Sequence, residues 1–246
     1  MNNENKKQHK FYSVRFSFFL VASITLLASL FGFFYGKRID PTSKAVSSEK
    51  ILLPAVILDA GHGGMDSGAV SVYGDEEKHF NLAVTKKLGA FLENAGIRVI
   101  YTRTEDEMVE CKEKNGSRKT RDLLGRVQCA QSNPDALFVS IHMNTLPIEK
   151  YKGLQIFYTD RNDANRALAQ VMQNNVRTML QTDNNRNAKD AEGKIFVLDR
   201  IRQPAILIEC GFLSNKEEAA LLKDEVYQNK LAYVLSRSII DFMAEK

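Results

Sequence analysis

Short apolar runs rich in β-branched residues alternate with longer amphipathic stretches through most of this chain. The apolar runs predict strands at residues 55–58, 97–102, 136–141, 154–158, 195–198 and 205–209. Apolar residues spaced three to four apart predict helices at residues 80–94, 121–132, 164–180 and 226–244. Polar stretches without a strong period predict loops at residues 105–120 and 183–194. This alternation predicts one α/β domain whose mostly parallel or mixed sheet is flanked by helices.

The net charge of +4 comes from the N-terminal part of the chain. Residues 1–50 hold eight Lys/Arg and three Asp/Glu, which leaves 26 and 27 for the rest of the 246 residues. A nearly neutral remainder argues against nucleic-acid binding by a folded domain. With 44% hydrophobic residues, this length is enough for one sizeable core.

The three cysteines, Cys111, Cys129 and Cys210, are odd in number and form no Cys-x-x-Cys pair, so no disulfide scaffold is predicted. Cys210 follows Glu209 on a predicted strand and therefore points to the opposite face of the sheet. We expect this thiol to pack as a small apolar group and not to act as a nucleophile.

An uncharged stretch lies near the N-terminus. Residues 16–35 carry no charge, and a helix of 20 residues is about 30 Å long, which matches the hydrocarbon core of a bilayer. Four basic residues precede the stretch and two follow it closely, which predicts a cytoplasmic N-terminus and an exported domain. The stretch ends without a small-x-small cleavage site, so we expect it to be retained as an anchor. The expected order is a cytoplasmic tail, a transmembrane anchor, a linker and a membrane-anchored, extracytoplasmic catalytic domain, at residues 1–15, 16–36, 37–52 and 53–246.

Polar residues follow three of the predicted strands at the positions where those strands end. His62 lies in a glycine-rich turn after one strand, and His142 and Glu209 end two others. Ligands in α/β folds gather beyond the carboxyl ends of the strands, so these side chains can meet. Two imidazoles suit zinc, and the acidic cluster at residues 75–77 offers the third protein ligand that a catalytic zinc site needs. The same cluster is also what a charged helix start looks like.

Glu209 is the candidate for proton transfer. It follows four apolar residues, so burial of its carboxylate requires a nearby cation or a proton. Zinc acidifies water and polarises a carbonyl, and Glu209 is then the general acid and base that passes the proton to the leaving amine. The sequence contains neither His-Glu-x-x-His nor Gly-x-Ser-x-Gly, which argues against helix-borne metalloproteases and serine hydrolases.

Five ordered blocks carry a family resemblance: LDAGHGGMDSGA (residues 58–69), EKHFNLAV (77–84), YTR (101–103), FVSIHMN (138–144) and PAILIECGFLSN (204–215). Together they resemble the zinc-dependent N-acetylmuramoyl-L-alanine amidases, which cleave peptidoglycan and have an α/β core. The resemblance extends over roughly residues 53–244. It implies one Zn²⁺ ion bound by His62, Glu77 and His142, with Glu209 as the catalytic residue.

Further positions also bear on the resemblance. Asn144 matches a family position, and we expect it to contact substrate or to support a metal ligand. His79 stands where the family often has Asp and is a weaker candidate ligand, and Cys210 is unusual beside the catalytic glutamate. Arg103 and Arg126 match family positions to which the sequence assigns no role.

The predicted anchor and the long polar stretch before Arg126 look most like the sporulation-linked members of the family. Those enzymes remove stem peptides from muramic acid in the spore cortex, and a separate deacetylase can then form muramic-δ-lactam. The expected partners are therefore peptidoglycan and the membrane, and an activating protein is left open. Two alternatives also stay open: a zinc peptidase or another cell-wall amide hydrolase, and a noncatalytic membrane-tethered wall-binding protein.

Overall fold

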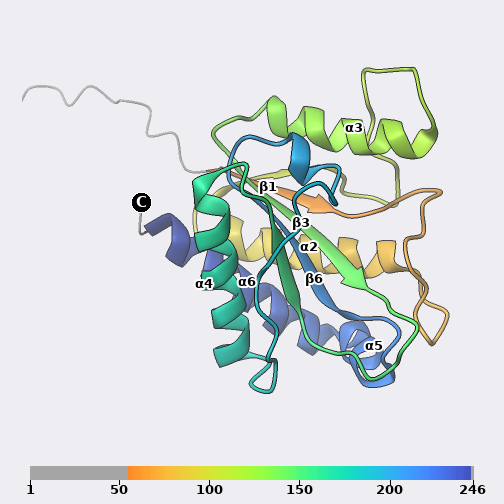
Figure 1. Cartoon of the computed structure of the whole chain (residues 1–246), viewed down its shortest axis with the longest axis vertical. Helices are drawn as coiled ribbons and strands as arrows, with labels where there is room; N and C mark the ends of the chain where they lie inside the picture. Colours follow the sequence, from red (N-terminus) through yellow and green to blue (C-terminus); the bar gives the residue numbers. More distant parts are fainter. Residues whose placement is uncertain (1–54, 245–246) are drawn as a thin grey trace, which may run out of the picture. The chain divides into compact units, whose positions relative to one another are not determined.

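The computed structural model describes residues 55–244, which form a six-stranded sheet with the order β2-β1-β3-β6-β4-β5 (Figure 1). The strands are β1 (Ala55–Ala60), β2 (Arg98–Tyr101), β3 (Leu137–Asn144), β4 (Gln155–Tyr158), β5 (Lys189–Asp190) and β6 (Ala205–Phe212). β2, β1, β3 and β6 are parallel, whereas β4 runs antiparallel to β6. The sheet is therefore mixed, and the predicted α/β class is confirmed.

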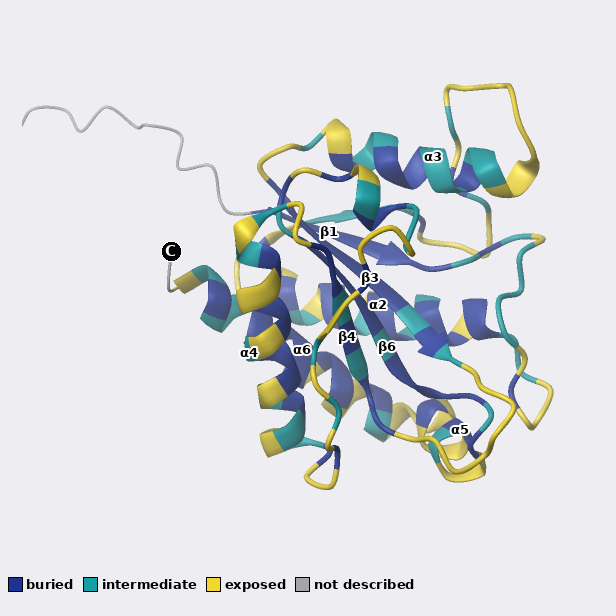
Figure 2. Cartoon of the chain, viewed as in Figure 1, coloured by how far each residue is buried: buried dark blue, intermediate teal, exposed yellow. Residues whose placement is uncertain are grey.

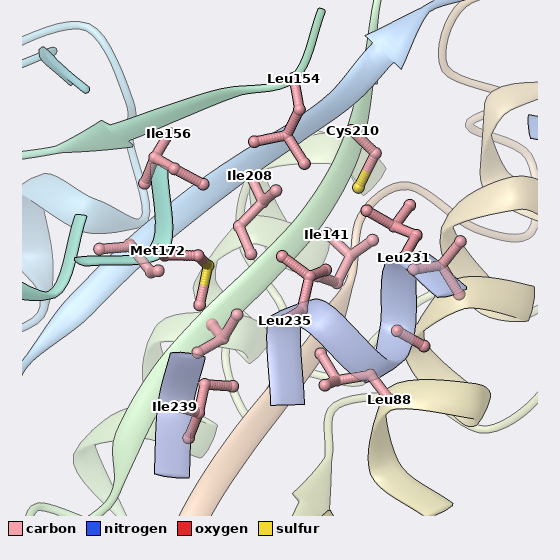
Figure 3. Close-up of a cluster of buried hydrophobic side chains, with 14 of the residues drawn as sticks. Leu88, Ile141, Leu154, Ile156, Met172, Ile208, Cys210, Leu231, Leu235 and Ile239 are labelled. Atoms are coloured by element: carbon pink, nitrogen blue, oxygen red, sulfur yellow. The ribbon is translucent and has the colours of Figure 1, made fainter. Parts of the chain in front are cut away.

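Five α-helices flank the sheet within the described residues: α2 (Glu77–Asn94), α3 (Arg118–Gln131), α4 (Asp163–Met179), α5 (Lys216–Lys223) and α6 (Glu225–Ala244). α2, α4 and α6 pack on one face, where they bury the larger apolar core. Figure 3 shows Ile141 and Ile208 of the sheet among Met172, Leu88 and Leu235 of these helices. On the other face, α3 and the 3₁₀ turn η1 (Leu198–Arg200) cover a smaller core.

The central strands are buried on both faces, as Figure 2 shows. Their near-continuous apolar sequences are typical of parallel strands between two helical layers. Side chains alternate between the layers, so Ile208 and Cys210 enter the larger core while Leu207 enters the smaller one. Cys210 is fully buried on the face opposite to Glu209, as predicted, and burial raises the pKa of its thiol well above the usual value.

The prediction of a strand at residues 195–198 is wrong. The segment forms turns that lead into η1, in which Asp199 N donates to Ile195 O at 3.0 Å and Asp199 Oδ1 accepts Gly193 N at 3.0 Å. Val197 and Leu198 are buried in the smaller core, so the apolar run packs against the sheet without joining it. The sheet edge beside β4 is formed by β5, which lies within a segment predicted to be a loop.

The helix α5 was missed because it has only eight residues. Asn215 caps it, with its side chain accepting Glu218 N at 3.0 Å. The four predicted helices are all present, and each begins one to three residues before the predicted start.

The expected tail, anchor and linker lie outside the described residues. Within residues 55–244, no helix is both long enough and apolar enough to cross a bilayer.

Candidate metal centre

The carboxyl ends of β1, β3 and β6 bring the candidate residues to one edge of the sheet. His142 pairs in register with Glu209 across β3 and β6, and Gly61 N, just beyond β1, donates to Ile141 O at 3.0 Å. His62 follows in the turn after β1, and Glu77 is the first residue of α2. Four positions far apart in sequence therefore meet. The strand-end pattern predicted this for His62, His142 and Glu209, whereas Glu77 comes from a helix start.

His62, Glu77 and His142 each offer one ligand atom, and these atoms lie within 4.8 Å of one another. Glu77 Oε2 is 3.2 Å from His62 Nε2, and Glu77 Oε1 is 3.0 Å from His142 Nδ1. Burial alone would raise the pKa of Glu77, but the hydrogen bonds from His142 and His62 lower it far below the usual range. The carboxylate is thus kept ionised between two ring nitrogens.

The glycines of the turn after β1 make this convergence possible. A Cβ on Gly61 would lie 2.2 Å from His142 Cε1, and one on Gly68 would lie 2.6 Å from Glu77 Oε2. His62 itself has a φ of 58°, the only positive φ among the described non-glycine residues. A residue with this φ is strained, and strain of this kind persists only where neighbouring groups hold the backbone in place.

Two buried arginines hold that turn. Arg103 donates Nε to Ala60 O and Nη2 to Gly61 O, each at 2.9 Å. Arg126 donates Nη1 to Ala60 O at 2.8 Å and Nη2 to His62 O at 2.7 Å. Three consecutive carbonyls are thus fixed by charged donors, which are stronger than neutral ones.

Acidic side chains balance the charge of Arg126. Asp122 accepts its Nε at 2.8 Å, and Asp59 accepts its Nη1 together with Ser140 Oγ at 2.6 Å. Burial alone would raise the pKa of Asp59, but Arg126 and the neighbouring hydroxyls hold it below its usual value. No sequence motif pointed to these roles, because the arginine donors bind backbone carbonyls that any residue provides.

A second carboxylate, that of Asp66, lies beside the imidazole of His62. His62 Nδ1 is 3.0 Å from Asp66 Oδ2, which is close enough for an ion pair. The geometry at Nδ1 is not that of a hydrogen bond. This leaves Nε2 of His62 to face Glu77. A carboxylate beside the outer ring nitrogen is the usual way in which proteins orient a metal-binding histidine.

Glu209 lies beside the cluster but is not part of it. Its side chain is partly exposed, yet Oε2 is buried and has no hydrogen-bond partner within residues 55–244. Burial raises the pKa of Glu209 to about 7, with a smaller lowering by His142 and a smaller raising by Glu77. A carboxyl group with a pKa near neutrality is suited to both accepting and donating a proton.

The remaining candidates lie outside the cluster. His79 is exposed and lies 3.4 Å from Glu76. Neither residue belongs to the cluster of possible metal ligands. Asn144 lies at the end of β3, two residues beyond His142, and its partly exposed side chain follows the same face of the strand. A cavity of about 240 Å³ beside the two histidines has a mixed lining of apolar residues, the acidic Asp59, Asp66 and Asp122, and the cations Lys119, Arg126 and Lys194.

The cluster fits a zinc ion by the chemistry of its donors. Two imidazoles and one carboxylate are a common protein ligand set for catalytic zinc. Oε2 of Glu209 beside them is buried, has no partner among residues 55–244, and is the group that a hydrolytic site needs for proton transfer. The fold and site together have the form of an α/β hydrolase with a candidate metal site.

Comparison with known families agrees with this class. The family model of N-acetylmuramoyl-L-alanine amidases matches residues 56–241. The chain belongs to this family of enzymes, whose members act on peptidoglycan in the cell wall.

Named relatives and solved structures place the chain within the family. It is 36% identical over 195 residues to the germination-specific N-acetylmuramoyl-L-alanine amidase of Bacillus subtilis, which covers 78% of this chain and 80% of that protein. The CwlD amidase of Clostridioides difficile, solved in complex with the GerS lipoprotein, has a TM-score of 0.74 and 35% identity, over 78% of this chain and 100% of that one. The amidase AmiC2 of Nostoc punctiforme has a TM-score of 0.68 and 32% identity, over 78% and 97%.

Proposed function

We propose that this protein is a zinc-dependent hydrolase that cleaves the amide between the lactyl group of N-acetylmuramic acid and the L-alanine of the stem peptide. His62, Glu77 and His142 would hold one zinc ion, and Glu209 would be the general acid and base. The observation that carries the proposal is the convergence of the three ligand atoms beside a Glu209 oxygen that is buried and without a partner within residues 55–244.

The proposed reaction gives one role to the zinc ion and another to Glu209. Zinc bound there would supply a Lewis acid that polarises the carbonyl and acidifies water. Glu209 accepts a proton as the water oxygen bonds to the carbonyl carbon. It then donates this proton to the amide nitrogen as the C–N bond breaks. The products are a lactyl carboxylate and a stem peptide with a free L-alanine amino group.

Asn144 is the proposed substrate contact. It lies on the face of β3 that carries His142, at the position paired with Phe212 of β6. Its amide provides both a donor and an acceptor for a peptide group. We propose that it orients the stem peptide beyond the scissile bond.

The relatives and the sequence support a proposal for the biological setting. The Bacillus subtilis relative is named as germination-specific, which supports action on spore-cortex peptidoglycan. We propose that residues 16–36 anchor the chain, that residues 37–52 link it to the catalytic domain at 53–246, and that this domain lies on the outer side of the membrane. A neighbour solved with a lipoprotein supports the proposal that a lipoprotein binds this amidase.

Mass spectrometry of digested peptidoglycan tests the proposal. The full-length chain is incubated with purified peptidoglycan, with added zinc or with a chelator, and the released fragments are identified. Free stem peptides that begin at L-alanine, released only with zinc, are the expected result. Cleavage within the stem peptide would instead identify a zinc peptidase, and activity undiminished by the chelator would refute the metal-dependent mechanism.

A further inference from the structure

We propose that Arg186 binds a carboxylate of the stem peptide and makes the enzyme selective for an acidic second residue. In peptidoglycan the second residue is D-glutamate joined through its side-chain carboxyl, so its α-carboxylate is free unless it is amidated. The inference rests on the proposed function, because it assigns a role to a residue outside the metal cluster in the same reaction.

The guanidinium of Arg186 is held in a fixed orientation. Its Nε donates to Lys152 O at 2.8 Å, and its Nη1 donates to Gln155 Oε1 at 3.0 Å. The guanidinium carbon lies 4.6 Å from the centre of the Phe212 ring. Stacking of this kind leaves the donor edge of the guanidinium free to bind other groups.

One nitrogen of this group is available to a ligand. Nη2 of Arg186 makes no hydrogen bond to any atom of residues 55–244, and the side chain is partly exposed. A preoriented guanidinium with unused donors is suited to a carboxylate, to which it forms charge-assisted hydrogen bonds.

The sheet register places this group near Glu209. Gln155, which accepts Nη1, pairs with Glu209 across the antiparallel strands β4 and β6. Paired residues of antiparallel strands point to the same face, with Cβ atoms about 5 Å apart. Phe212, under the guanidinium, pairs with Asn144 on the face that carries His142. Arg186 therefore lies on the catalytic face of the sheet, one side chain beyond Glu209.

This spacing suits the second residue of the stem peptide. An extended chain advances by about 3.3–3.6 Å per residue, so a carboxylate two residues from the scissile bond lies about 7 Å from it. A stem peptide that leaves Glu209 across β4 would meet the guanidinium of Arg186, which donates to Gln155, the residue paired with Glu209.

A cavity of about 560 Å³ adjoins Arg186 and is also lined by the charged residues Lys150, Lys152, Asp183, Glu217 and Glu218. Lys152 forms an ion pair with Asp183. Glu218 accepts Gly153 N at 2.9 Å and Phe212 N at 2.8 Å. Lys150 lies over the Tyr151 ring, 5.6 Å from its centre, at the exposed rim. Arg186 is thus the cation of this cavity that also donates to Gln155, the residue paired with Glu209.

The test compares two muramoyl-peptide substrates that differ in one group. One carries D-isoglutamate at the second position and the other carries D-isoglutamine, in which the carboxylate is an amide. The full-length, zinc-loaded chain is assayed as wild type, as Arg186→Gln and as Lys189→Gln. Lys189 is an exposed cation three residues further along the same segment, so it controls for the loss of charge alone.

We expect the wild type to favour the acidic substrate by about tenfold or more in kcat/KM, mainly through KM, because loss of a charge-assisted hydrogen bond commonly has an effect of this size. Arg186→Gln should lose this preference and cleave the amidated substrate at the wild-type rate, which also shows that it is folded. Lys189→Gln should behave as the wild type.

Two results would overturn the inference. A wild type that cleaves both substrates equally would exclude a carboxylate-binding role for Arg186, although the proposed amidase activity would stand. An Arg186→Gln variant that keeps the preference would assign the selectivity to another residue. A wild type that cleaves neither substrate would refute the proposed function itself.

Discussion

Glu209 combines two properties that are costly for stability in the absence of metal. Its Oε2 is buried without a partner in the described chain, and it lies close to the carboxylate of Glu77. Sites of this kind favour proton transfer over stability, since a buried charge without a partner destabilises the fold.

The raised pKa of Glu209 predicts a pH-dependent stability in the metal-free protein. The folded pKa is about 7, whereas an unfolded glutamate titrates near 4.3, so the folded state holds an extra proton between these values. Stability therefore falls as pH rises through this window, and Glu209→Gln lacks this fall. From pH 5 to pH 8, the free energy of unfolding should decrease by on the order of 2 kcal/mol more in the wild type than in the variant.

Urea denaturation of both proteins in the presence of a chelator measures this difference. The two proteins differ only at residue 209, so the comparison isolates the contribution of this carboxyl group and its coupling to its neighbours. Parallel pH profiles for the wild type and Glu209→Gln would contradict the raised pKa.

Adding a single Cβ atom at Gly61 should weaken zinc binding. In Gly61→Ala the new Cβ would lie 2.2 Å from His142 Cε1, so the imidazole must leave its position facing Glu77. Zinc affinity, measured by competition with a chromogenic chelator, should fall by about 10- to 100-fold, as for other disturbances around metal ligands. Gly74→Ala is the control, because Gly74 has open space around its Cβ position; its φ of 86°, which Gly61 does not share, adds backbone strain without crowding. Equal zinc affinity in Gly61→Ala and the wild type would show that the crowding is relieved without moving His142.

At the scale of elements, α3 positions the turn after β1 through Arg126. This arginine joins the carbonyls of Ala60 and His62 to the carboxylates of Asp59 and Asp122. Lysine retains the charge but cannot serve four acceptors in one plane. Arg126→Lys should therefore weaken zinc binding by about tenfold and lower the melting temperature of the metal-free protein.

Arg121→Lys is the matched control for this prediction, since it makes the same change on the same helix. Arg121 Nε is buried without a hydrogen-bond partner in the described residues, so it does not hold the turn. If the two variants bound zinc equally well, α3 would have no role in positioning His62.

The elements also show how far the sequence can predict this site. His62, His142 and Glu209 could be placed together because each follows an apolar run, and parallel strands end at one edge. Composition could not decide between Glu76 and Glu77 as the third metal ligand. Only the family resemblance favoured Glu77. The turn at residues 195–198 was misread because its apolar residues are buried like those of a strand, although they make no ladder hydrogen bonds.

At the scale of the whole molecule, the proposed anchor sets where the enzyme acts. The full-length chain should sediment with membranes after an alkaline wash and dissolve only in detergent, whereas a chain that begins at residue 53 should stay in the supernatant. Ultracentrifugation followed by immunodetection measures this distribution. Recovery of the full-length chain in the aqueous supernatant would contradict the anchor.

The central claim is that Glu209 transfers the proton at a zinc centre that cleaves the muramoyl–alanine amide. The measurement that tests it most directly compares wild type with Glu209→Gln at equal zinc content, by counting the stem peptides released from peptidoglycan. The account predicts unchanged zinc stoichiometry and a loss of turnover of about 10²- to 10⁴-fold, the usual contribution of a general acid or base. Wild-type turnover by the zinc-loaded variant would contradict it.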